Sequence, residues 1–294
     1  MDYLNDNLEK ILLLPGFIIV MLVAFVPVVY LFYTSAFDYS PLMRTFEFIG
    51  FRNYIEILSS QDFWRYLSHT LIYAGGTTTV VFTLGLGGAW SLNQIKRGRL
   101  LFLMITLLPF MLPMAAGAVM AQWMFNDLYG VVNHLLQVVG LINQPVAWLT
   151  QTVPAFVIVV LTDAWCNMPL AFIILFAGFQ RVPAHLEDAA RVDGANKLQT
   201  LTNLYLPFIR PEIFMVLFMI TMFSFRHFAI VYLVTGEGPG DSTAVLATYI
   251  QKTAMANLEY GKASAIAVIM VIITIIYAGW YFLWAQKRGS DVGE

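Results

Sequence analysis

Long apolar stretches dominate this sequence of 294 residues. We predict one helix in each of six of them, near residues 12–34, 68–92, 101–124, 155–179, 209–233 and 263–285. A helix of about 20 apolar residues is long enough to cross a bilayer. The stretches also lack the alternation of apolar and polar residues that is typical of barrel strands. The pattern therefore predicts an all-α membrane protein with six transmembrane helices.

The composition supports a membrane protein and excludes several other classes of protein. Only 12% of the residues are charged and the mean hydropathy is +0.72, whereas soluble domains carry about 25% charged residues. Disordered chains combine low hydrophobicity with high charge, so disorder is excluded as well. The net charge of −2 gives no basic surface for nucleic acid. A single cysteine, Cys166, and scattered histidines suggest no metal site. We therefore expect membrane lipid to surround the apolar helices.

The distribution of lysine and arginine predicts the orientation. Under the six-helix prediction, one side carries ten of these residues outside the spans and the other side carries five. Cytoplasmic loops carry the excess, so both termini are expected in the cytoplasm. The cluster of Lys96, Arg97 and Arg99 is the strongest part of this signal. The first apolar stretch exceeds the usual length of a signal peptide, so we expect it to remain as an anchor.

The inner segment 180–208 is unusually long and charged. Pro183 can open a helix, and Glu187 and Asp188 would lie in its first turns, where the helix dipole favours negative charge. Gly194 can end that helix in a left-handed conformation. A second helix can then run from Asn196. Two interpretations stay open on this physical basis: a solvated amphipathic hairpin, or a docking element for a soluble partner.

Within this segment the chain resembles a known family. Asp188-Ala189-Ala190, then Asp193-Gly194-Ala195, and later Leu206-Pro207 are similar to the "EAA" loop of ABC importer membrane subunits. The family usually has Glu at the position of Asp188. In the family, this loop forms the coupling helix that docks on the ATPase. The resemblance implies an ATPase contact formed by Glu187, Asp188, Ala189, Ala190, Asp193 and Gly194.

Flanking segments extend the resemblance over nearly the whole chain. They occur in the order found in carbohydrate permeases: 48–54, 108–113, 165–169, 225–228 and 232–239. The last two are similar to the first permease subunit of maltose, glycerol-phosphate and trehalose systems. The resemblance implies a type I ABC importer permease, a single domain over residues 1–294, in the bacterial plasma (inner) membrane.

Polar residues inside the predicted spans are the candidates for solute contact. Asp163 and Asn167 share a helix face, and so do Ser224 and His227. Ionisable groups at this depth are costly, and they line pathways or pair with one another. Their donors and acceptors suit a hydroxyl-rich ligand. An alternative for two residues is a buried ion pair between Asp163 and Arg226.

The resemblance extends this set to a predicted substrate pathway. In the maltose-type relative, the matching positions line the sugar cavity; here they are Phe110, Met114, Asp163, Cys166, Asn167, Leu170, Phe223, Ser224 and His227. Arg226 matches a neighbouring position. Ala229 stands where the family commonly has Asp. Because several of these side chains are apolar or weakly polar, the particular sugar is not transferred.

The resemblance implies the translocation subunit of an ATP-driven importer of a sugar or sugar-like solute, working by alternating access. The expected partners are a second homologous permease, two ATP-binding subunits and an extracytoplasmic solute-binding protein. The chain has no Gly-x-x-x-x-Gly-Lys-Ser/Thr sequence. We therefore expect a non-catalytic subunit without a cofactor, with ATP and Mg²⁺ bound by the ATPase.

The competing hypothesis is a secondary transporter driven by protons through Asp163 and His227. Such transporters usually contain internal repeats, and none is evident here. That hypothesis also gives the inner segment 180–208 no docking role. The importer is favoured.

Overall fold

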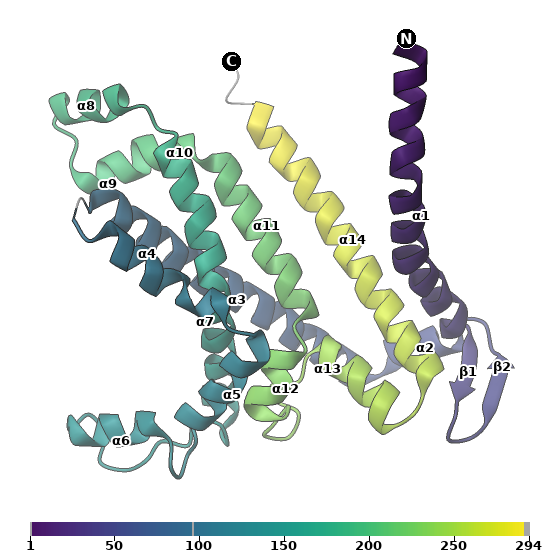
Figure 1. Cartoon of the computed structure of the whole chain (residues 1–294). Coiled ribbons are helices and arrows are strands. Elements are labelled where there is room, and N and C mark those ends of the chain that lie inside the picture. Colours follow the sequence, from purple (N-terminus) through teal and green to yellow (C-terminus); the bar gives the residue numbers. More distant parts are fainter. Residues whose placement is uncertain (1, 96, 291–294) are drawn as a thin grey trace. The chain divides into compact units, whose positions relative to one another are not determined.

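The computed structural model describes residues 2–95 and 97–290, with side chains described at residues 12, 14–95 and 97–286. Most of this part is helical (Figure 1). Its helices and strands, in chain order, are α1 (Asp2–Ser35), β1 (Phe37–Ser40), β2 (Thr45–Phe48), α2 (Arg52–Ser59), α3 (Gln61–Gln94), α4 (Arg99–Leu107), η1 (Leu108–Met111), α5 (Met114–Met124), α6 (Val131–Val138), α7 (Thr152–Gln180), α8 (Ala184–Val192), α9 (Lys197–Thr200), η2 (Leu201–Tyr205), α10 (Leu206–Phe208), α11 (Arg210–Arg226), α12 (Ala229–Thr235), α13 (Leu246–Gln251), η3 (Lys252–Ala256) and α14 (Tyr260–Ser290).

The chain divides into two compact units. The first contains residues 1–64 and 249–273, and the second contains residues 65–248 and 274–294. In the first unit, β1 and β2 form an antiparallel hairpin. The amide of Asn53 donates to the carbonyls of Ser35 and Phe37, at 2.9 and 3.0 Å, and so fixes α2 to the start of the hairpin. The single permease domain over residues 1–294 stays a prediction.

Helix α7 is the centre of the second unit. Its buried side chains include Ala164, Phe172 and Leu175, which belong to a core cluster shared with α3 and α11. The approach of α3 to α7 is close, because a Cβ on Gly85 would lie 2.8 Å from the Cβ of Ala171. Packing around α7 therefore fixes the helix on which several predicted site residues stand.

Four of the predicted spans lie inside continuous helices. These are 12–34 in α1, 68–92 in α3, 155–179 in α7 and 263–285 in α14. By length and composition, four helices of the described part can cross a membrane, or up to six if each of two bent pairs is one span. Six transmembrane helices and cytoplasmic termini stay predictions. Among the cations that support this orientation, Lys96 and the side chains of Lys10, Lys287 and Arg288 lie outside the described residues.

The other two predicted helices are broken. The range 101–124 bends by 96° between Met111 and Met114, where Pro113 supplies no amide hydrogen for a continuous helix. The range 209–233 is wrong as one helix, because α11 ends at Arg226 and α12 begins at Ala229. No proline lies at this second break. Instead, the backbone of His227 is extended (φ −73°, ψ 98°).

Candidate functional site

A buried polar cluster lies where α11 breaks. The Asp163 carboxylate, on α7, is 0% exposed. Its Oδ2 accepts a hydrogen bond from the Tyr73 hydroxyl of α3 at 2.6 Å, and its Oδ1 accepts one from the Asn167 amide at 2.6 Å. The Nδ1 atom of His227 lies 2.9 Å from Oδ1. Because a buried carboxylate is costly unless it is paired, these donors explain how Asp163 is accommodated.

The contact with His227 involves both oxygens of the Asp163 carboxyl group, since Nδ1 lies 2.9 Å from Oδ1 and 3.0 Å from Oδ2. The His227 side chain is 12% exposed, whereas Asp163 is completely buried. Of this pair, the imidazole is thus the group with access to the surface of the unit.

The structure gives Asp163 a different partner from Arg226, which was the alternative left open by the sequence. The Arg226 side chain is exposed, and its guanidinium carbon lies 5.6 Å from the centre of the Phe223 ring. His227 takes the place of arginine because the extended backbone after α11 turns its ring to the carboxylate. The Asp163–Arg226 ion pair is therefore corrected to an Asp163–His227 pair.

The other predicted pathway residues differ in how far their side chains are buried. Cys166, Asn167 and Ser224 are buried, and the Ser224 hydroxyl donates within its own helix to Ile220. Phe223, Met114 and Leu170 are partly buried. Phe110 is 55% exposed. The structure thus brings Asp163, Asn167 and His227 together, and it adds Tyr73, which the sequence analysis missed. A tyrosine among apolar residues gave no signal of this role.

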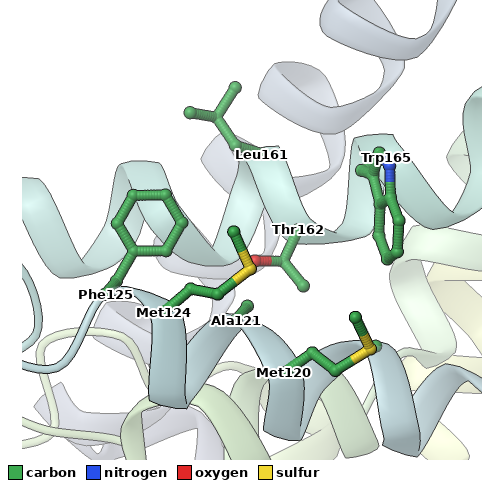
Figure 2. Close-up of a pocket in the computed structure, with 8 residues that line it drawn as sticks. Met120, Ala121, Met124, Phe125, Leu161, Thr162 and Trp165 are labelled. Carbon is green, nitrogen blue, oxygen red and sulfur yellow. The ribbon is translucent and has the colours of Figure 1, made fainter. Parts of the chain in front are cut away.

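A pocket of about 450 Å³ lies between α5 and α7 (Figure 2). It is lined by Gly117, Met120, Ala121, Met124, Phe125, Leu161, Thr162 and Trp165. The Thr162 hydroxyl donates to the Ile158 carbonyl at 2.7 Å, so the lining is essentially apolar. At Gly117 the helices come close, since a Cβ there would lie 2.9 Å from Cys166 Sγ. Cys166 is the predicted pathway residue beside this pocket.

The candidate docking element, residues 184–196, and the segment after it have the predicted helix–turn–helix form. Helix α8 follows Pro183, and Gly194 ends its turn with a left-handed φ of +77°. Asn196 caps α9 by accepting a hydrogen bond from the Gln199 amide at 2.9 Å. None of the described side chains of α8 is buried. Of the predicted coupling residues, Asp188, Ala189, Asp193 and Gly194 are exposed, and Glu187 and Ala190 are partly buried.

Comparison with known proteins gives the class of this chain. Residues 80–289 match the family described as binding-protein-dependent transport system inner membrane component, and the chain belongs to that family. Its members are non-catalytic permease subunits of ABC importers, whose partner ATPases hydrolyse ATP. This family membership confirms the resemblance to ABC importer permeases. It also confirms that the chain is a non-catalytic subunit and that it is a multi-pass protein of the plasma membrane. The family also confirms a binding-protein-dependent system.

Individual relatives are similar over almost their full length. The trehalose/maltose transport system permease protein MalF of Thermococcus litoralis is 30% identical, over 94% of each chain. The sulfoquinovosyl glycerol transport system permease protein SmoG of Agrobacterium fabrum is 33% identical, over 95% of this chain and 90% of the relative. A crystal structure of a bacterial ABC transporter that imports alginate has a chain with a TM-score of 0.86, covering 97% of each chain. At 23% identity, that likeness shows the fold.

Proposed function

We propose that this chain is one of two homologous permease subunits that form a pathway for a sugar or sugar-like solute. It would cross the membrane six times with both termini in the cytoplasm. Two ATP-binding subunits would bind ATP and Mg²⁺, and an extracytoplasmic protein would deliver the solute. The carbohydrates in the names of MalF and SmoG support this solute class. This chain would need no cofactor of its own.

The observation that carries the proposal is the exposed helix α8 with its turn at Gly194. Exposed Asp188 offers a negative charge, and exposed Ala189 permits close approach of a partner. The positive φ of Gly194 makes the turn that a residue with a Cβ rarely adopts. We assign the 184–196 element to docking on an ATPase, and the hairpin hypothesis without a partner becomes the less supported one.

For the solute, we propose that the nine predicted pathway residues line a cavity during alternating access. His227 is the polar member best placed for contact, because its ring is partly exposed and already fixed by Asp163. Asp163 itself has its oxygens occupied by Tyr73, Asn167 and His227. We therefore assign Asp163 to holding His227. Exposed Phe110 offers a ring on which the apolar face of a sugar can stack.

Uptake of labelled sugars tests this function. The chain would be expressed with its partner permease, ATPase and binding protein in cells that take up neither trehalose, maltose nor sulfoquinovosyl glycerol. We expect uptake of at least one of these sugars that requires this chain and persists when an uncoupler collapses the proton gradient at constant ATP. Uptake that stops with the gradient while ATP remains would instead favour proton coupling through Asp163 and His227.

A further inference from the structure

We propose that Tyr205 is a positioning residue that links α8 to the end of α3 through a chain of hydrogen bonds. This proposal rests on the proposed coupling role of α8. Helix α8 is joined covalently to the segments before and after it, but α3 lies far away in the sequence. A non-covalent link is therefore needed if movement of α8 is to reach α3 directly.

The ring of Tyr205 is held tightly between two helices. Tyr205 ends the π-helical turn η2 and is only 3% exposed. Its ring centre lies 5.2 Å from that of Trp90 on α3 and 5.2 Å from that of Phe179 on α7. The interplanar angles of 72° and 84° are edge-to-face arrangements, which stabilise aromatic pairs beyond burial alone. The position of the phenol oxygen is thus fixed by α3 and α7.

The hydroxyl of Tyr205 joins two polar groups from different elements. It donates to Oε2 of Glu187 on α8 at 3.1 Å, and it accepts from the Asn93 amide on α3 at 3.1 Å. Each bond uses a different capacity of the hydroxyl, one as donor and one as acceptor. The Tyr205 oxygen therefore connects the proposed docking helix with α3.

The chain of bonds continues in both directions. Beyond Asn93, the side-chain oxygen Oδ1 of Asn93 accepts from the Gln180 side-chain amide at 2.9 Å, and Oε1 of Gln180 accepts from Arg99 at 3.1 Å. On the other side, Glu187 Oε1 accepts from Arg191 at 2.7 Å. Bonds of this kind through Tyr205 tie together α3, α4, α7, η2 and α8. Figure 1 shows α9 next to the ends of α3 and α4, and α8 on the far side of α9.

Helix α8 has no fully buried side chain: Leu186, Glu187 and Ala190 are partly buried, and its other side chains are exposed. A pocket of about 280 Å³ separates parts of α8 and α3, with Trp90 and Gln94 on one side and Glu187 and Arg191 on the other. Among the described residues, the Tyr205–Glu187 bond is the only side-chain hydrogen bond from α8 to another element. Through Tyr205, this bond is thus the polar contact by which α8 can act on α3.

Hydrogen–deuterium exchange on the assembled complex tests the link without knowledge of the solute. The permease, its partner permease and the ATPase would be held in lipid nanodiscs, with and without Mg²⁺ and a non-hydrolysable ATP analogue. In the wild type, we expect the analogue to change exchange in peptides of α8 and of the α3 end, residues 86–95. In Tyr205→Phe, the α8 response should remain, and the α3 response should fall about fivefold, the effect of one hydrogen bond of ordinary net strength.

Matched variants separate the link from a general structural effect. Asn93→Ala should reproduce the loss on α3, and the double variant should add no further loss, because both changes break the same link. Tyr281→Phe is the control, since it removes a hydroxyl that donates to the Phe214 carbonyl at 2.6 Å, outside the chain of bonds. We expect that control to respond as the wild type does.

Two results would overturn the proposal, and each would have a different consequence for the coupling role of α8. An unchanged α3 response in Tyr205→Phe and Asn93→Ala, with a normal α8 response, would remove the link and leave the coupling role of α8 intact. No response of the wild-type α8 peptide to the analogue would contradict that coupling role itself, and the link would fall with it.

Discussion

At the scale of single residues, Asp163 and His227 have separate roles that their types alone did not reveal. Spacing along the predicted helices placed Asp163 with Asn167, and the structure contains this hydrogen bond. Spacing could not decide between Arg226 and His227 as the partner of Asp163, because they are adjacent in the sequence. The choice depends on the extended backbone at His227, which is a tertiary feature. The contribution of Tyr73 from another helix is equally invisible to periodicity.

A pair of His227 variants separates solute contact from positioning. His227→Ala should lower both uptake and the unfolding temperature in detergent, because it leaves the buried Asp163 carboxyl group without one of its hydrogen-bond partners; such losses are about 2 kcal/mol. His227→Gln keeps a side-chain donor, so we expect it to restore most of the unfolding temperature. Uptake should stay reduced about tenfold, the effect of losing about one hydrogen bond to the solute.

The control for these variants is His134→Ala, because His134 is exposed on α6. That variant should match the wild type in uptake and unfolding temperature. If His227→Gln took up solute at the wild-type rate, His227 would be removed from the proposed pathway and kept as a structural partner of Asp163.

At the scale of elements, the sequence predicted where helices occur better than it predicted whether each helix is continuous. Four predicted ranges lie within single helices, because long apolar runs specify helix directly. The bend near Pro113 could be suspected from proline, but its angle of 96° depends on packing. The break after Arg226 has no proline, and so the local sequence gave no sign of it. The turn at Gly194 was predicted well, because glycine marks a left-handed helix end.

Gly194→Asp tests the coupling element. An L residue at φ +77° costs about 1 kcal/mol, and the added charge lies on the proposed docking surface. We expect solute uptake to fall about tenfold or more, the loss for one charge-assisted contact. Binding of the solute to the external protein should not change, because that protein is a separate chain. ATP hydrolysis should no longer respond to the loaded binding protein.

Gly140→Asp provides the matched control. Gly140 also has a positive φ, +73°, and open space around its Cβ position, but it lies outside the 184–196 element. Uptake near the wild-type level is expected there. Normal, ATP-coupled uptake by Gly194→Asp would remove the 184–196 element from the proposed coupling role.

At the scale of the whole molecule, composition and motif order were sufficient for the class. Low charge and high hydropathy indicated a membrane protein, and the match over residues 80–289 confirmed the importer family. The partners could not be obtained in the same way, because their binding surfaces include residues of other chains. Under the proposed function, the exposed helix α8 is the feature of this chain that points most clearly to a partner subunit.

The most direct test is to isolate the chain from its native membrane in mild detergent and to identify the proteins that remain bound by mass spectrometry. We expect a second permease of the same family and an ATPase with a P-loop, since the 184–196 element is proposed to dock there. Gly194→Asp should reduce recovery of the ATPase without loss of the second permease. Purification of the wild-type chain alone, or only with copies of itself, would contradict a permease that works as part of an ATP-driven importer.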